Sequence, residues 1–261
     1  GGGCFGYAQA LAMKYADLSS VDVFAGTSVG AANALAAAAE IPVNDLLHYY
    51  RDRAPKIFAG HGWRKILRAA IAPRYNDDEL DCALKDLFGN LKTHQLRRPV
   101  IVAAHDLTRG QVRVIYSHHV SMPVWELARM SMAAHTYFRS YNNQRDGGFF
   151  DNDPCHAAII ELLATHSACL SSIRMFSVGN GRNPVIRKPR DYREPATAFG
   201  VLAELIHDTL DGKSVVAQRR ASKVLLDTCG GRFEWFEFPD TLMDMDDPQV
   251  VEMIRARVLA E

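Results

Sequence analysis

The sequence predicts an α/β fold with a mostly parallel sheet, and two observations carry this prediction. Short runs rich in β-branched and aromatic residues, typical of buried strands, alternate along the chain with longer runs of helix-forming residues. In addition, 48% of the 261 residues are hydrophobic, which is enough to fill the core of one such domain. Strands separated by helices favour a parallel sheet that helices cover on both faces. Because the chain has no repeat, low-complexity segment or clear linker, we expect a single domain over residues 1–261.

The expected elements follow from local composition and from turn residues. The strongest helix is predicted over residues 29–40, because seven of these twelve residues are alanine, the best helix former. Acidic residues in the first turn of the helix predicted over 77–87 complement its dipole. We expect helices over residues 8–15, 29–40, 43–58, 63–71, 77–87, 123–134, 154–163 and 248–259, two further helices between residue 196 and the last strand, and strands over residues 21–25, 99–104, 111–116, 173–178 and 233–238.

Charge, hydropathy and cysteine usage exclude several classes of protein. The 30 basic and 30 acidic residues give a formal net charge of zero, which argues against a protein that binds a nucleic-acid duplex. No run of about 18 uninterrupted apolar residues occurs, so no transmembrane helix is expected. The five cysteines are scattered without a CxxC pair or zinc spacing, and we expect free thiols and no metal site. This pattern favours a reducing cytoplasm, with peripheral attachment to a membrane left open.

The segment Gly26-Thr27-Ser28-Val29-Gly30 fits the pattern G-x-S-x-G and lies between an expected strand and the strongest expected helix. Small residues on either side allow a tight reversal, which holds the serine at the tip of the turn in a strained conformation. Its hydroxyl then lies at the N-terminus of a helix, where free N–H groups favour an alkoxide or an oxyanion. We interpret Ser28 as a candidate nucleophile. The alternative is a serine that caps an ordinary core helix.

The chain opens with a glycine-rich segment, GGGCFG, that ends at Gly6. Before a helix, the backbone N–H groups of Gly1, Gly2 and Gly3 can form a concavity that binds negatively charged oxygen. Such a concavity suits either a phosphate or a developing oxyanion. The segment lacks the Lys-Ser/Thr of a P-loop and is not a GxGxxG fingerprint, although Asp22 keeps a dinucleotide-binding interpretation open.

Asp146-Gly147-Gly148 is the third element with possible chemistry. An aspartate followed by two glycines can occupy a tight turn and aim its carboxylate at a neighbour. The position of Asp146 is 118 residues after Ser28, so only the fold can bring the two side chains together. Combined with the serine turn and the glycine segment, Asp146 becomes a candidate general base.

A Ser-His-Asp triad is the alternative to a serine paired with an aspartate alone. The α/β-hydrolases use the chain order serine, acid, histidine, and three histidines follow the candidate aspartate. Those hydrolases, however, build most of their sheet before the serine turn, whereas only 25 residues precede Gly26 here. We therefore interpret the three as ordinary surface or core histidines: His156, His166 and His207.

Together, the three motifs resemble those of the patatin-like phospholipases, which are lipid acyl hydrolases with a Ser-Asp dyad. GGGxxG near the start, GTSVG about twenty residues later and DGG far downstream occur in that family's order and spacing. Further matching segments are SMAA at 131–134 with Tyr137-Phe138, DGGFFDNDP at 146–154, FSVG at 176–179 and the Met-Asp-Asp region at 243–247. The resemblance spans residues 1 to about 247. It implies a three-layer α/β/α sandwich with a mostly parallel central sheet.

The resemblance also implies roles for the motif residues. Ser28 would be the nucleophile and Asp146 the base that takes the place of a histidine, with no cofactor and no metal. Phe5 departs from the family, which often has Arg or Lys there, and the family's strand before the glycine segment would precede Gly1. The remaining roles are the oxyanion hole for Gly1, Gly2, Gly3 and Cys4, the nucleophile elbow for Gly26, Thr27, Val29 and Gly30, and support of the aspartate for Gly147 and Gly148.

The function implied is that of a phospholipase A type enzyme, which cleaves fatty-acyl esters of membrane phospholipids through an acyl-enzyme. A non-catalytic or autoinhibited binding module and a membrane-degrading effector switched on by an unidentified small molecule are the alternatives. Residues 58–74 place apolar side chains at helical spacing among basic ones, which fits either a helix on an anionic membrane surface or a core helix. The residues concerned are Trp63, Ile66, Leu67, Ala70 and Ile71, with Arg64, Lys65, Arg68 and Arg74.

Overall fold

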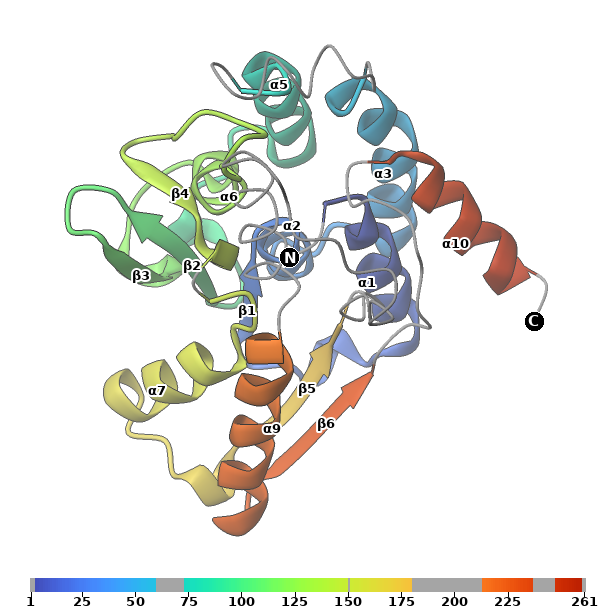
Figure 1. Ribbon diagram of the computed structural model, residues 1–261. Helices are drawn as coiled ribbons and strands as arrows, with labels where there is room; N and C mark the ends of the chain where they lie inside the picture. The colour runs from blue at the N-terminus through green and yellow to red at the C-terminus, as the bar shows by residue number, and fades with distance from the viewer. Residues whose placement is uncertain (1–2, 60–72, 150, 180–212, 237–246, 260–261) are drawn as a thin grey trace, which may run out of the picture.

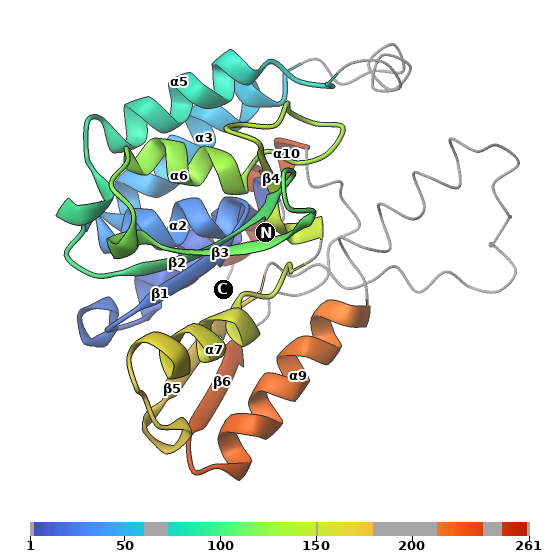
Figure 2. The same ribbon diagram turned by 90° about the vertical axis from the view of Figure 1, so that its left-hand side faces the viewer.

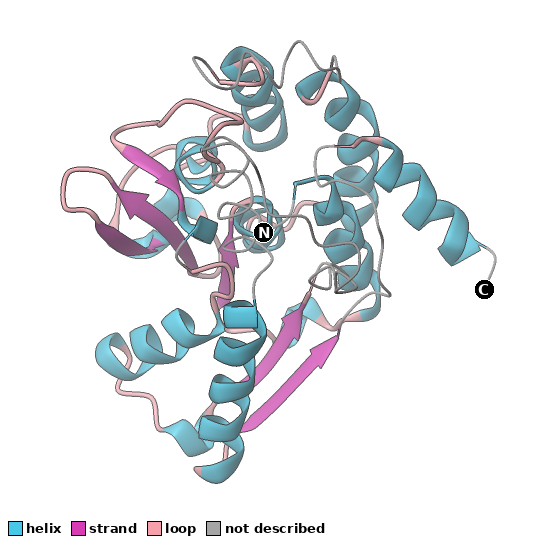
Figure 3. Cartoon of the chain, in the orientation of Figure 1, coloured by secondary structure: helices cyan, strands magenta, loops and turns pink. Residues whose placement is uncertain are grey.

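The computed structural model describes residues 3–59, 73–149, 151–179, 213–236 and 247–259. Strands and helices alternate along the chain, so the expected α/β fold is confirmed (Figures 1 and 3). Figure 2 shows α2, α3, α5 and α6 above β1, β2 and β3, and α7 and α9 below these three strands, beside β5 and β6. The helices therefore form the two outer layers of an α/β/α sandwich.

Strand β2 is the centre of the larger sheet, and all of its residues are buried. It pairs in parallel with β1 and antiparallel with β3 and β4, whereas β5 and β6 form a separate parallel pair. The parallel pairs join strands that long connections separate, whereas β2 and β3 form an antiparallel hairpin. The strands are β1 (Phe24–Thr27), β2 (Val100–Asp106), β3 (Gln111–Tyr116), β4 (Gln144–Asp146), β5 (Arg174–Val178) and β6 (Arg232–Phe236).

The helices agree with most of the predicted ranges to within a few residues. The predicted helix over 8–15 divides into an α-helix and a following 3-10 turn over Met13–Tyr15. The helices are α1 (Gly6–Ala12), α2 (Val29–Ala38), α3 (Val43–Ile57), α5 (Asp77–Phe88), α6 (Val124–Ser131), α7 (Cys155–Thr165), α9 (Lys213–Thr228) and α10 (Gln249–Leu259). The helix predicted over 63–71, residues 196–212 and residues 237–238 lie outside the described residues.

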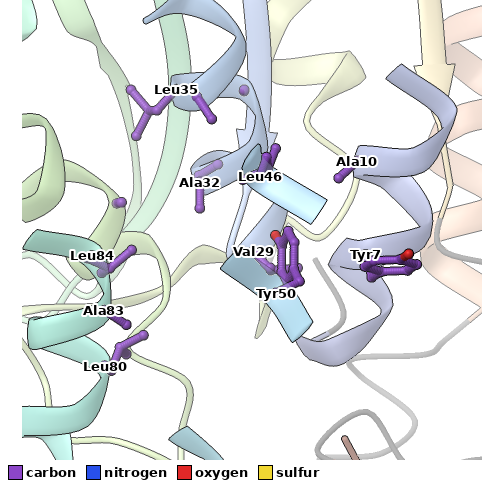
Figure 4. Close-up of a cluster of buried hydrophobic side chains, with 14 of the residues drawn as sticks. Tyr7, Ala10, Val29, Ala32, Leu35, Leu46, Tyr50, Leu80, Ala83 and Leu84 are labelled. Atoms are coloured by element: carbon purple, nitrogen blue, oxygen red, sulfur yellow. The ribbon is translucent and has the colours of Figure 1, made fainter. Parts of the chain in front are cut away.

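The main core surrounds α2, whose alanines let neighbouring elements approach closely (Figure 4). Ala32 and Leu35 of α2 lie in one buried cluster with Leu46 and Tyr50 of α3. Val29 belongs to the same cluster at the first turn of the helix, where it is 3% exposed. Burial of apolar surface on several sides fixes the position of this first turn, which directly follows Ser28.

Two boundaries next to the candidate site differ from the predicted ones. The first strand does not break at Gly26 but continues to Thr27, because β2 offers pairing partners up to that position. The predicted turn at 146–148 begins within a strand, since Asp146 is the last residue of β4 and Gly147 opens a 3-10 turn. A strand of three residues is too short to show an alternating pattern, which is why the sequence did not predict β4.

Candidate active site

Ser28 occupies a sharp reversal between β1 and α2. Its backbone angles are φ 56° and ψ −130°, a conformation that costs a residue with a Cβ atom about 1–3 kcal/mol. The strand before it and the helix after it come very close together, because a Cβ atom on Gly26 would lie 2.2 Å from the Gly30 carbonyl oxygen. The predicted nucleophile elbow therefore has the strained serine and the close glycine approach that its pattern requires.

Strand β2 aligns the serine with the aspartate. Thr27, the residue before Ser28, pairs with Ala103, and Asp146 pairs with the next residue, Ala104. Two segments that are 118 residues apart in the sequence thus occupy consecutive positions along one edge of β2. As a result, the Ser28 hydroxyl donates a hydrogen bond of 2.5 Å to Oδ2 of Asp146.

The carboxylate of Asp146 is buried, with the residue 4% exposed. Its other oxygen, Oδ1, accepts a hydrogen bond of 2.7 Å from the Gly148 amide, and the Asp146 amide donates to the Ala133 carbonyl at 3.1 Å. Burial raises the pKa of Asp146, while the hydrogen bonds from Ser28 and Gly148 oppose this effect. A raised pKa makes the carboxylate a stronger base than an exposed aspartate.

Gly147 brings β4 against the backbone of β2. A Cβ atom at this position would lie 2.6 Å from the carbonyl carbon and oxygen of Ala103, closer than any side chain can approach. At Gly148 the nearest atoms are the Asn152 Oδ1 at 2.8 Å and the Asp146 Oδ1 at 3.0 Å. Both glycines therefore stand where a larger residue would displace Asp146 or its surroundings.

Part of the predicted oxyanion hole lies outside the described residues, namely Gly1 and Gly2. Gly3 and Cys4 begin a short 3-10 helix over Gly3–Phe5, with the cysteine buried. The last glycine of the segment, Gly6, packs so closely on α2 that a Cβ atom there would lie 2.4 Å from Cγ2 of Val29. The glycine segment thus ends in contact with the residue that follows Ser28.

A buried polar network holds this end of the glycine segment in place. The Asn33 side chain on α2 donates a hydrogen bond of 3.0 Å to the Gly6 carbonyl, and it accepts one of 2.7 Å from the Tyr50 hydroxyl. Both side chains are buried. The sequence alone does not indicate a role for Asn33 or Tyr50, because neither lies in a recognisable motif.

The histidines of the alternative triad lie elsewhere or outside the described residues. The ring of His166 contacts the Tyr116 hydroxyl at 2.5 Å, and His207 is not among the described residues. His156 lies within α7 and is exposed. In the described part of the chain, no group of three or more His, Cys, Asp or Glu residues is arranged to hold a metal ion.

Asp151 lies beside the elbow and titrates close to neutral pH. Its carbonyl accepts a hydrogen bond of 3.1 Å from the Thr27 hydroxyl, which joins it to the residue before Ser28. Burial, followed by the charge of Asp153, raises the pKa of Asp151 to about 6. Among the described residues, the buried Oδ1 atom of Asp151 has no hydrogen-bond partner.

This carboxyl group leads to a prediction about stability. Between its ordinary pKa of 3.8 and its raised pKa of about 6, Asp151 binds protons more tightly in the folded chain, so stability falls as pH rises through this window. Asp151→Asn is therefore expected to unfold at a higher urea concentration than the wild type at pH 7 and at a similar one at pH 4. Urea titrations at both pH values check this, and an equal difference at the two would contradict it.

The segment of residues 58–74, which the sequence relates to membranes, lies largely outside the described residues, since 60–72 are not described. No helix in the described ranges combines the length and apolar character needed to cross a bilayer.

Comparison with known proteins gives three matches. A family model described as patatin-like phospholipase matches residues 1–159, a range that contains both Ser28 and Asp146. Patatin-like protein 4 of Arabidopsis thaliana is 29% identical over 160 residues, which are 51% of this chain and 39% of that protein. A cGAMP-activated phospholipase of Pseudomonas aeruginosa (strain BWHPSA011 / Pa011) is 29% identical over 148 residues, 52% of this chain and 44% of that protein. The chain spans less than half the length of these two relatives.

Proposed function

Because the chain belongs to the patatin-like phospholipase family, we propose that it hydrolyses fatty-acyl esters of membrane phospholipids in a reaction of the phospholipase A type. The observation that carries the proposal is the hydrogen bond of 2.5 Å between the Ser28 hydroxyl and the buried Asp146 carboxylate. It pairs a nucleophile with a base at the N-terminus of a helix, which is the arrangement that acyl transfer needs.

In the proposed reaction, Ser28 Oγ attacks the ester carbonyl carbon while Asp146 Oδ2 accepts the serine proton. The backbone N–H groups of Gly1, Gly2, Gly3 and Cys4 stabilise the negative charge on the tetrahedral intermediate. The intermediate collapses to an acyl-serine, and the proton on Asp146 passes to the departing alcohol. Asp146 then takes a proton from water, whose oxygen attacks the acyl carbon, and this proton returns to Ser28 Oγ as the fatty acid leaves. The elbow holds the attacking oxygen in a fixed orientation. Less entropy is therefore lost when the oxygen is aligned with the ester carbonyl.

The substrate places the enzyme at a membrane surface, where it acts as a peripheral protein. A second candidate is activation by a small molecule, because one relative is named a cGAMP-activated phospholipase. A non-catalytic binding module is less consistent with the site, since the serine and the aspartate are both present and in contact.

Covalent labelling and product analysis test the proposal. A fluorophosphonate probe is expected to modify the chain at Ser28, as located by mass spectrometry of the peptide that contains the elbow, and to abolish hydrolysis of a p-nitrophenyl ester in parallel. Phospholipid vesicles incubated with the protein are expected to yield free fatty acid and lysophospholipid. Labelling at another residue would exclude the mechanism. Vesicles left intact by a protein that hydrolyses the p-nitrophenyl ester would exclude the lipid substrate.

A further inference from the structure

Ser131, the last residue of α6, joins three elements of the site. Its side chain is fully buried at 0% exposure. The Ser131 hydroxyl donates a hydrogen bond of 2.6 Å to the Ala103 carbonyl and accepts one of 2.8 Å from the amide of Ser28. Since a hydroxyl has one proton and two lone pairs, both interactions are satisfied at the same time. The Ser28 peptide group is thereby linked to the strand that also aligns Asp146.

The Ser28 amide needs such a partner for two reasons. Ser28 stands at the N-cap of α2, where amide groups have no acceptor within the helix. Its positive φ angle of 56° is unfavourable for a serine and persists only when the surroundings enforce it. A single hydroxyl on α6 therefore holds the peptide group whose conformation aims the nucleophile.

Helix α6 is itself fixed against α5, so Ser131 is a rigid acceptor. Arg129, two residues earlier and 1% exposed, donates to Asp77 at 2.6 Å and to Asp81 at 2.5 Å, and both carboxylates lie on α5. The same guanidinium donates to the Arg139 carbonyl at 3.3 Å. Bonds on both sides of a planar guanidinium restrict movement of the helix end that carries Ser131.

We propose that Ser131 is a positioning residue, which holds the Ser28 amide so that the Ser28 hydroxyl stays directed at Asp146. Its effect on turnover rests on the proposed function, whereas its effect on the Ser28 backbone does not. A second consequence concerns the oxyanion: because the Ser28 amide already donates to Ser131, the N–H groups that stabilise the intermediate are those of the glycine segment.

The chain offers a closely matched control, Ser117. Its side chain is also fully buried, and its hydroxyl accepts a hydrogen bond of 2.8 Å from the amide of Val100 at the opposite end of β2. Each serine hydroxyl accepts a hydrogen bond from a backbone amide, and replacement by alanine removes that bond in either case. Of these two serines, only Ser131 is bonded to the elbow.

Ser131→Ala is expected to lower kcat for a p-nitrophenyl ester by about 10²-fold, because a small displacement of a nucleophile has effects of this size. KM is expected to stay within about twofold, since the substrate contacts are unchanged. The rate of fluorophosphonate labelling should fall in parallel. Ser131→Thr, which retains the hydroxyl, should recover most of the labelling rate. Ser117→Ala should shift the unfolding midpoint as Ser131→Ala does while leaving kcat within about twofold.

Hydrogen exchange of the Ser28 amide separates this proposal from the proposed function. Exchange of the peptide over residues 24–31 is expected to be faster in Ser131→Ala and unchanged in Ser117→Ala. Equal exchange in the wild type and Ser131→Ala would overturn the positioning role, whether or not the protein hydrolyses esters. Equal losses of kcat in the two alanine variants would overturn it as well, by showing that only general stability had changed. A wild type without esterase activity but with the expected exchange would contradict the proposed function alone.

Discussion

Asp146→Asn is expected to lower kcat for ester hydrolysis by about 10³–10⁴-fold, to the residual level of Ser28→Ala. An asparagine keeps the size of the side chain and the contact with the Gly148 amide, but its amide cannot accept the serine proton. The two variants combined should be no slower than either alone, because both remove the same proton transfer. Steady-state rates with a p-nitrophenyl ester, and fluorophosphonate labelling for Asp146→Asn, measure the effect.

The control for this variant is Asp106→Asn on the neighbouring strand. Asp106 is also buried, and its Oδ1 accepts a hydrogen bond of 2.6 Å from the Thr108 hydroxyl and one of 2.9 Å from the Thr108 amide. The bond from the hydroxyl contributes most, and together the two bonds lower the pKa of Asp106 to about 2. Its charge therefore stabilises the fold fully above the ordinary pKa of 3.8, and this stability is lost as pH falls towards 2. Asp106→Asn should therefore lose stability at pH 7 and keep its turnover.

The charge of Asp146 has the opposite effect on stability, because burial raises the pKa of this carboxyl group. Asp146→Asn should therefore leave stability at pH 7 unchanged or raise it. Active sites commonly contain charged groups that lower stability but are needed for activity. In the wild type, kcat/KM should rise with pH through a pKa above that of an ordinary aspartate. Near-normal turnover in Asp146→Asn, or an equal loss of turnover in Asp106→Asn, would refute the assignment of the base.

Gly26→Ala is the second substitution with a large expected effect. The added methyl group would lie 2.2 Å from the Gly30 oxygen and 2.6 Å from the Ala31 nitrogen, both backbone atoms of α2 that no side-chain rotation can move. Strand and helix must separate, at a cost of about 3 kcal/mol, the upper part of the range for overpacked sites. Because this separation moves Ser28 away from Asp146, fluorophosphonate labelling should also become undetectable.

Gly110→Ala provides the comparison for this prediction. Nothing lies within 4 Å of a Cβ atom at Gly110, whose φ is +65°, so alanine there costs only the conformational penalty of about 1–2 kcal/mol. Urea unfolding of both variants, with labelling measured well below the unfolding transition, separates the two effects. Rapid labelling of a folded Gly26→Ala protein would show that the close approach at the elbow is dispensable.

The parts of the site that the sequence predicts are those that local physics determines. Steric demands within five residues explain the elbow at Ser28, and alanine content explains α2. The contact with Asp146 depends instead on the register of two strands against β2, one of them only three residues long, and no local pattern encodes it. The resemblance to a family supplied that pairing.

Other features were missed because their chemistry appears only after folding. Ser131 opens the SMAA segment that resembles the family, but the resemblance assigns it no role, which follows only from its hydrogen bonds to the Ser28 amide and the Ala103 carbonyl. The raised pKa of Asp151 likewise depends on burial, which a polar turn sequence does not suggest. The strand boundary at Gly26 was wrong because a pairing partner extended β1 to Thr27.

Because β1 and β4 both pair with β2, the effect of an insertion or a deletion should depend on where in the chain it falls. Neighbouring positions on one strand, Ala103 and Ala104, set the register of the serine and the aspartate, and the tip of the β2–β3 hairpin takes no part in these pairs. Insertions between residues 107 and 110, the tip of the hairpin, should therefore be neutral for turnover. A single-residue deletion inside β4 should inactivate the protein, because a slip of one position turns the carboxylate to the opposite side of the sheet.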